Sequence, residues 1–301
     1  MKVSNEEIRL PLLETKGVSL SIKREDTIHP LISGNKYRKL KYNLIRARAQ
    51  EQTQLLTFGG AYSNHIAATA YAGKLHGFET IGVIRGEELK NKWSQNPTLR
   101  LAKEHGMRFY FVPREVYRLR NTKEFEAGLQ KQYGDFYLLP EGGTNSLAIK
   151  GCEEILNDQD EGFDVICCCV GTGGTLAGLV NSSSRHQHVL GFSALKGDFL
   201  LNDIRKFARK DNWKLILDYH FGGYAKVNAE LVHFSNDFKE KTAIQLEPIY
   251  TGKLFYGLLD LISKDFFDRG TSILAIHTGG LQGITGMNQL LKKKNLPLLN
   301  L

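Results

Sequence analysis

The sequence predicts an α/β protein built from mostly parallel sheets with helices on both faces. Short apolar runs alternate with segments of helical periodicity along the chain, the pattern typical of β-α-β units. Glycine-rich turns follow several of the apolar runs. The length of 301 residues, with 42% hydrophobic and 24% charged residues, suits one large globular domain or two smaller ones.

The alternation can be followed element by element. Apolar runs predict strands at 54–58, 80–84, 108–112, 164–170, 188–192 and 273–277. Helical periodicity predicts helices at 36–48, 63–76, 97–104, 122–132, 176–181, 202–208 and 282–291. Because strands that are apolar throughout are buried on both faces, we expect parallel rather than antiparallel pairing.

Three of the four cysteines are adjacent, at 167–169, and the fourth is Cys152. Adjacent cysteines cannot form a disulfide framework, and they lack the ligand spacing of a metal site. We therefore expect no metal, and we expect small apolar fillers of a central strand.

The net charge of +8 raises the possibility of nucleic-acid binding. The basic residues are spread over the chain, and the clusters at 118–123 and 292–294 are short and contain few aromatic residues. We expect no nucleic-acid partner, but rather a site that attracts a phosphate and a carboxylate. No apolar run approaches the ~20 residues of a membrane helix, and residues 1–7 lack a secretory apolar core. A cytoplasmic protein without membrane contact is expected.

Glycine-rich turns follow predicted strands at 58–61, 141–143, 171–174 and 278–280. Ligands of open α/β sheets bind at the carboxyl ends of the strands. Any single turn could simply start a helix with a flexible backbone. All four together favour one shared cleft.

One of these turns resembles a phosphate site. Gly171, Thr172, Gly173, Gly174 and Thr175 follow six apolar residues and precede a predicted helix. Glycines let backbone amides approach an anion, and the helix N-terminus adds positive potential. The turn is neither a P-loop nor the spaced dinucleotide fingerprint, so a mononucleotide-sized phosphate fits it better.

Lys36 and Lys39 lie three residues apart on one face of the predicted basic helix. Taken alone, such lysines are ordinarily solvated. Gly34 and Asn35 provide a tight turn and a predicted cap at the helix start. Together with the distant glycine turn, the pair indicates pyridoxal phosphate (PLP). Lys36 would bind the aldehyde as a Schiff base, while Lys39 and the turn would bind the phosphate.

Ser63, Asn64 and His65 follow another glycine pair at the start of a predicted helix. Helix-start amides with a hydroxyl form a natural carboxylate pocket. Ser63 could instead be only an N-cap, and the two roles are compatible.

The chain resembles the 1-aminocyclopropane-1-carboxylate (ACC) deaminase / D-cysteine desulfhydrase family of fold-type II PLP enzymes, which have the tryptophan synthase β-like fold. The matching segments, in family order, are 23–26, 34–36 with 38–40, 59–60 with 63–65, 140–143, 171–175, 247–253 and 277–280.

The resemblance implies roles for individual residues. It makes Lys36 the Schiff-base lysine and the base for the substrate Cα proton. It gives Asn64 the cofactor 3′-oxygen, Tyr250 the cofactor ring and Thr278 the pyridine nitrogen. The phosphate would be bound by Lys39 and by residues 171–175. The substrate carboxylate would be bound by Ser63, Asn64 and His65, and the predicted catalytic residues are Lys36, Ser63, Tyr224 and Tyr250.

The family fold further implies two three-layer α/β/α domains. The large PLP-binding domain would comprise 1–46 and 146–301, with a small α/β domain at 47–145 inserted in it. The resemblance also implies a homodimer acting on a small amino acid.

Two positions resemble the D-cysteine desulfhydrase branch. ACC deaminases carry glutamate after the ring-facing tyrosine and glutamine after the Ser-Asn pair, whereas this chain has Thr251 and His65. The favoured prediction is a lyase that converts D-cysteine to pyruvate, sulfide and ammonia, with Tyr250 or Tyr224 protonating the leaving group. The alternatives are an ACC deaminase and a catalytically silent PLP-binding homologue, and the intact Lys36 argues against the latter.

Overall fold

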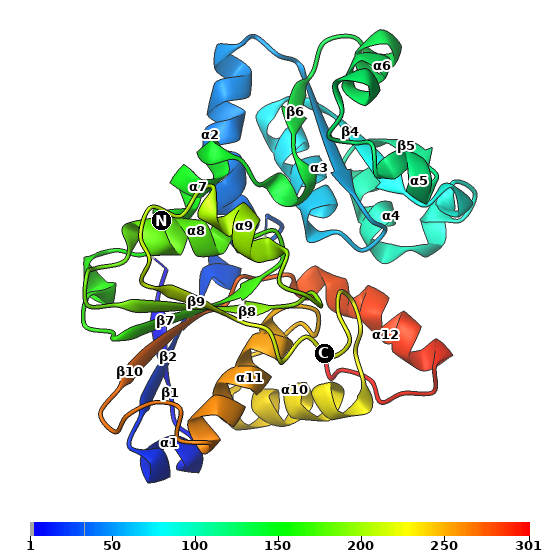
Figure 1. Cartoon of the computed structure of the whole chain (residues 1–301). Coiled ribbons are helices and arrows are strands. Elements are labelled where there is room, and N and C mark those ends of the chain that lie inside the picture. The colour runs from blue at the N-terminus through cyan, green and yellow to red at the C-terminus, as the bar shows by residue number, and fades with distance from the viewer. Residues whose placement is uncertain (1–2, 33) are drawn as a thin grey trace.

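The computed structural model describes residues 3–32 and 34–301, and over these residues the chain forms two sheets with helices on both faces (Figure 1). The larger sheet has the order β1 (Asn5–Ile8), β2 (Ser19–Lys23), β10 (Ser272–Ile276), β7 (Val165–Val170), β8 (His188–Ser193) and β9 (Trp213–Ile216). The smaller sheet has the order β5 (Arg108–Val112), β4 (Glu79–Arg85), β3 (Gln54–Gly59) and β6 (Tyr137–Leu139). Among the strands of the described residues, only β1 and β2 pair antiparallel, so the predicted mostly parallel α/β fold is confirmed.

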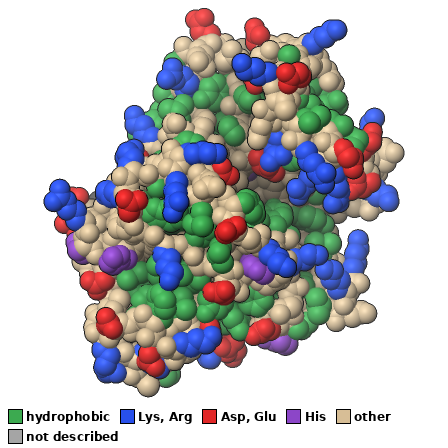
Figure 2. Space-filling view, in the orientation of Figure 1, with side chains coloured by type: hydrophobic (Ala, Val, Ile, Leu, Met, Phe, Trp, Pro, Cys, Tyr) green, Lys and Arg blue, Asp and Glu red, His purple; other side chains and the backbone are tan. Residues whose placement is uncertain are grey.

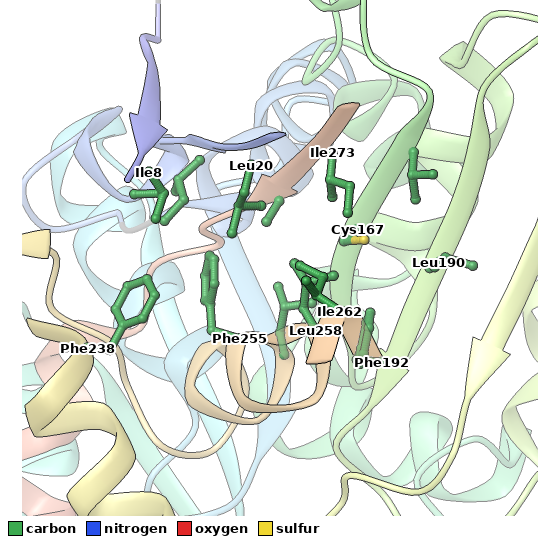
Figure 3. Close-up of a cluster of buried hydrophobic side chains, with 14 of the residues drawn as sticks. Ile8, Leu20, Cys167, Leu190, Phe192, Phe238, Phe255, Leu258, Ile262 and Ile273 are labelled. Atoms are coloured by element: carbon green, nitrogen blue, oxygen red, sulfur yellow. The ribbon is translucent and has the colours of Figure 1, made fainter. Parts of the chain in front are cut away.

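The larger sheet separates two apolar layers. One layer contains α1 (Pro11–Lys16), α10 (Ala229–Thr242) and α11 (Thr251–Ser263), and the other contains α7 (Ser146–Cys152), α8 (Gly174–Ser182) and α9 (Leu200–Arg205). Because side chains alternate along a strand, Cys167 and Cys169 join the first layer and Cys168 joins the second. Figure 3 shows Cys167 of the central strand among the side chains of the first layer. The cysteines are therefore core residues, as predicted.

The smaller sheet is covered in the same way. On one face lie α2 (Asn35–Ala49), α3 (Asn64–His76) and α4 (Pro97–Glu104), and on the other lie α5 (Arg114–Tyr117) and α6 (Lys123–Tyr133). All strands of this sheet fall between residues 54 and 139. The domain boundaries stay a prediction, and α2 runs across the proposed boundary at 46/47.

The six predicted strands are present, and helices occur at all seven predicted places, with shifted ends. The sequence prediction missed β1, β2, β6 and β9, which are short, and it made no prediction for α10 and α11. The last helix is α12 (Ile284–Lys293). Among the described residues, no helix combines the length and the apolar character needed to cross a bilayer.

The start of α2 is fixed by a close backbone approach. Gly34 precedes α2 with φ 56°, and a Cβ there would lie 1.8 Å from the Thr278 carbonyl oxygen. The Asn35 amide donates to that same oxygen at 3.3 Å. The predicted side-chain cap is wrong, because Asn35 Nδ2 donates across to Thr175 Oγ1 at 2.8 Å instead. The first turn of α2 is thus tied both to the end of β10 and to the start of α8.

Charged side chains of residues 23–26 form buried ion pairs near the start of α2. Lys23 Nζ lies 2.7 Å from an Asp160 carboxylate oxygen, and both side chains are buried. Glu25 accepts two hydrogen bonds from the Arg38 guanidinium, at 2.8 and 3.0 Å. Each of these buried charges has a partner, so the ion pairs of residues 23–26 hold the end of β2 and helix α2 in a fixed arrangement.

Replacing Gly34 with alanine should destabilise the protein, because the added methyl group meets a backbone carbonyl and the left-handed φ disfavours any other residue. We expect a loss of about 3 kcal/mol in the free energy of unfolding, measured by chemical denaturation. Gly128→Ala is the matched control, because a Cβ at that helix position would meet no described residue beyond its own stretch of helix within 4 Å. Equal stabilities of the two variants would contradict this assignment.

Candidate active site

A cavity lies where the carboxyl ends of β3, β7 and β10 meet the start of α2, with about 560 Å³ of empty space when its opening to solvent is included. The predicted site residues that line it are Lys36, Lys39, Asn64, Gly171, Thr172, Gly173, Thr175, Tyr250 and Thr278. The other lining residues are Asn35, Gly142, Cys169, Val170, Leu176, Gly279 and Gly280. Three of the four predicted glycine turns, at 141–143, 171–174 and 278–280, therefore contribute to one cavity, and Asn64 lies just beyond the fourth turn.

The glycine turn between β7 and α8 presents free amides to this cavity. The backbone amides of Thr172, Gly173 and Gly174 have no hydrogen-bond partner among the described residues. Gly174 itself does not line the cavity, but a Cβ there would lie 3.2 Å from Lys39 Nζ. A Cβ on Gly171 would lie 2.9 Å from the Tyr250 ring. The turn can therefore approach an anion closely only because these positions are glycines.

Lys39 lies beside this turn. Its side chain is buried, and its ammonium donates to Thr144 Oγ1 at 2.9 Å, to the Gly142 carbonyl at 3.2 Å and to Thr172 Oγ1 at 3.4 Å. Burial lowers the pKa of Lys39. No carboxylate among the described residues pairs with it, so an entering phosphate would supply the missing negative charge.

Lys36 is the second amine of the cavity. Burial, together with the nearby charge of Lys39, lowers the pKa of Lys36 to about 7. The amine is therefore about half neutral at pH 7 and mostly neutral by pH 8. A neutral amine is the form that attacks an aldehyde and accepts a proton.

The start of α3 provides two more free amides. Ser63 is the N-cap, and its hydroxyl accepts from the Ile66 amide at 3.3 Å, as one of its two predicted roles requires. The amides of Asn64 and His65 have no partner among the described residues. Asn64 Oδ1 accepts from Gln282 Nε2 at 2.9 Å, which fixes the orientation of the amide group. Asn64 lines the cavity whereas Ser63 does not, so the Asn64 amide is a better placed carboxylate donor than the Ser63 hydroxyl.

The His65 ring is buried beneath the cavity rather than lining it. Thr57 Oγ1 donates to the Leu139 carbonyl at 2.9 Å, so it accepts from His65 Nε2 at 2.8 Å. His65 Nδ1 then carries a lone pair and has no partner among the described residues. Burial and the two nearby lysines hold the pKa of His65 well below its usual value. A carboxylate could thus bind the His65 backbone amide, but not its neutral ring.

Two tyrosines meet at one side of the cavity. The rings of Tyr224 and Tyr250 lie 6.2 Å apart and are tilted by 58° to each other. Burial raises the pKa of both hydroxyls, so both keep their protons at neutral pH. Tyr224 does not line the cavity directly and is 37% exposed, and it reaches the site through Tyr250.

Tyr250 is oriented by Glu247, whose role the sequence prediction missed although the residue lies in a matching segment. The buried Glu247 carboxylate accepts from the amides of Ile249, Tyr250 and Thr251 at 2.6 to 3.0 Å. It thereby caps the start of α11, next to Tyr250. Burial raises the pKa of Glu247 to about 7. Its oxygens point into the helix start, so its role is structural.

Thr278 and Cys169 also line the cavity, with Thr278 Oγ1 3.0 Å from Cys169 Sγ. The sequence prediction missed that Cys169 and Asn35 line the cavity. It also missed Gln282, which orients Asn64 without lining the cavity. The only sequence signal for them was their nearness to the glycine-rich turns. The contact of Thr278 with a pyridine nitrogen stays a prediction.

The donor set fits PLP. Lys36 has an amine that can lose its charge near neutral pH, and it lies beside the buried ammonium of Lys39. Next to both is a turn of free amides, which a Cβ would obstruct. An aldehyde and a phosphate are the groups that such donors bind. Lys36 would bind the aldehyde carbon, and Lys39 with the turn would bind the phosphate.

Comparison with known proteins agrees with this chemistry. The family model described as pyridoxal-phosphate dependent enzyme matches residues 3–279. A Pyrococcus furiosus protein provisionally named 1-aminocyclopropane-1-carboxylate deaminase is 31% identical over 289 residues, which cover 89% of this chain and 86% of that protein. An Arabidopsis thaliana protein named bifunctional D-cysteine desulfhydrase/1-aminocyclopropane-1-carboxylate deaminase, mitochondrial, is 32% identical over 295 residues, which cover 89% of this chain and 74% of that protein.

A solved structure of an ACC deaminase homologue superposes with a TM-score of 0.83 at 28% identity, covering 97% of this chain and 94% of the other. The predicted fold-type II architecture and the predicted cofactor are confirmed. The chain belongs to the pyridoxal-phosphate dependent enzyme family, among the homologues of ACC deaminase.

Proposed function

We propose that this enzyme removes the β-substituent of a small amino acid, with D-cysteine as the favoured substrate. The balanced reaction is D-cysteine plus water giving pyruvate, hydrogen sulfide and ammonia. One observation carries the proposal: among the described residues that line the cavity, none is aspartate or glutamate. The available groups are a lysine base and tyrosine proton donors, which β-elimination needs.

Each step can be assigned to a group of this chain. The free amides of Asn64 and His65 would hold the substrate carboxylate. Lys36, with its lowered pKa, would take the proton from Cα. The Tyr250–Tyr224 pair would give a proton to the thiolate as the Cβ–S bond breaks. Bound PLP supplies the electron sink for the charge that develops at Cα.

ACC deamination is the alternative, and the names of the relatives favour it. ACC has no Cα proton, so opening its ring needs an additional acid, base or nucleophile. The family glutamate that follows the ring-facing tyrosine is replaced here by Thr251. Its buried hydroxyl bonds the backbone amide and carbonyl of Glu247, at 2.9 and 3.1 Å. Position 251 thus supplies no acid to the cavity.

The proposal also includes a homodimer in the cytoplasm that binds only small-molecule ligands. The name of the Arabidopsis relative assigns that protein to mitochondria. Light scattering on the purified protein would test the dimer.

The first test is a product assay with D-cysteine, L-cysteine and ACC offered separately to the PLP-loaded protein. Sulfide and pyruvate should appear from D-cysteine, and 2-oxobutyrate should not appear from ACC. Lys36→Ala, which removes the proposed base, should abolish the products. 2-Oxobutyrate from ACC would establish the alternative instead. Bound cofactor without any product would indicate a catalytically silent homologue.

The lowered pKa of Lys36 predicts how PLP binding depends on pH. Only the neutral amine attacks the aldehyde, so the rate of PLP binding to the apoprotein should rise about tenfold from pH 6 to pH 8 and then level off. The growth of the visible absorption band measures this rate, and Lys36→Ala controls for non-covalent binding. A rate that still climbs above pH 9 would show an ordinary lysine.

Restoring the family glutamate with Thr251→Glu should not create ACC deaminase activity. The new carboxylate would be buried beside that of Glu247, whose oxygen already lies 3.0 Å from the Thr251 amide. We expect a loss of about 3 kcal/mol in the free energy of unfolding. Thr251→Ser, which keeps the hydroxyl, is the control. A stable Thr251→Glu protein that releases 2-oxobutyrate would show that this side chain reaches the cavity.

A further inference from the structure

We propose that Arg85 forms a subsite for an anionic group carried by the leaving substituent of the substrate. The inference rests on the proposed β-elimination and narrows its substrate class. The preferred substrates would be amino acids whose β-sulfur bears a carboxylate or a similar anion.

Arg85 does not itself line the cavity, but it lies beside the loop that leads to the proposed carboxylate pocket. It is the last residue of β4, which pairs with β3 up to Gly59 and Ile84. A Cβ on Gly60 would lie 3.5 Å from Arg85 Nη2, so the guanidinium packs against the loop that leads to Ser63 and α3. Figure 2 shows basic side chains beside a hollow in the surface.

The guanidinium has a rigid support. Its central carbon lies 5.6 Å from the centroid of the Tyr117 ring, which is 2% exposed. The Tyr117 hydroxyl donates to Glu141 at 2.8 Å, which fixes the ring. A stacked guanidinium loses little freedom when it binds a ligand, because the ring already holds it.

A second arginine on the same ring shows what Arg85 lacks. Arg120 lies 5.0 Å from the Tyr117 centroid and pairs with Glu141 at 2.8 Å. Arg85 has no carboxylate within 4.0 Å among the described residues. One ring thus supports a neutralised arginine and an unpaired one, and the unpaired one faces Gly60.

The charge of Arg85 lies within electrostatic reach of Tyr224, on the side that the proposed function gives to the leaving group. Burial raises the pKa of the Tyr224 hydroxyl, and the positive charge of Arg85 opposes that rise. Tyr224 is the partner of Tyr250, the proposed proton donor to the departing thiolate. A carboxylate attached to that sulfur would extend toward Arg85, where a charge-assisted, two-pronged hydrogen bond can form.

The test compares two substrates that differ only in charge, S-carboxymethyl-D-cysteine and S-carbamoylmethyl-D-cysteine. With water, each would give pyruvate, ammonia and the corresponding thiol. Arg85→Gln should lower kcat/KM about tenfold for the carboxymethyl substrate and leave the carbamoylmethyl substrate unchanged. Arg120→Gln, which removes a paired charge from the same ring, should not discriminate between them. Arg85→Lys should restore part of the preference.

Calorimetric titration of the PLP-loaded protein with each compound separates this inference from the proposed function. If neither compound is turned over, the proposed elimination fails, and a selective loss of carboxymethyl affinity in Arg85→Gln would still support the subsite. Equal losses for both compounds, or a loss that Arg120→Gln reproduces, would overturn the subsite. Wild-type protein that binds the two compounds equally would overturn it as well.

Discussion

The site depends on one contact, in which the backbone at Gly34 packs directly on the Thr278 carbonyl at the end of β10. This approach leaves no room for a side chain and fixes where α2 begins. Lys36 and Lys39 lie in the first two turns of that helix, so their positions follow from it. The Asn35–Thr175 hydrogen bond then ties the same turn to α8, next to the phosphate-binding turn. The relative positions of the Lys36 amine, the phosphate-binding turn and the end of β10 are therefore fixed together.

Among the described residues, the charged side chains that line the cavity are all basic. A buried amine, Lys39, and a partly buried amine, Lys36, lie in it, and the described lining residues include no carboxylate. This arrangement lowers the pKa of Lys36 and keeps the His65 ring neutral. An unpaired buried charge costs free energy, and a bound phosphate offsets that cost. The protein thus keeps a strained charge distribution where its cofactor binds, while it neutralises charges elsewhere, as Glu25 does for Arg38.

Much of the fold could be predicted from periodicity because the buried parallel strands are apolar throughout. Short or mixed strands such as β1 and β9 carry too little pattern to be recognised. Glycine turns located most of the cavity, since their backbones must approach a ligand. The predicted capping role of Asn35 was wrong, because its side-chain amide donates to Thr175, 140 residues away, and does not cap its own helix. Contacts such as that of Arg85 with Tyr117 follow from tertiary packing alone.

The bonds of Lys39 set a condition on cofactor loading. An ammonium group has three hydrogens, and those of Lys39 are already directed to Gly142, Thr144 and Thr172. The first two acceptors follow the smaller sheet, and the third belongs to the turn of the larger sheet. A phosphate oxygen can reach this ammonium only by replacing one of them, and the 3.4 Å bond to Thr172 is the longest. Cofactor exchange therefore changes the hydrogen bonds that connect the part of the molecule with the smaller sheet to the part with the larger sheet. The same three hydrogens of Lys39 serve both to bind PLP and to connect these two parts.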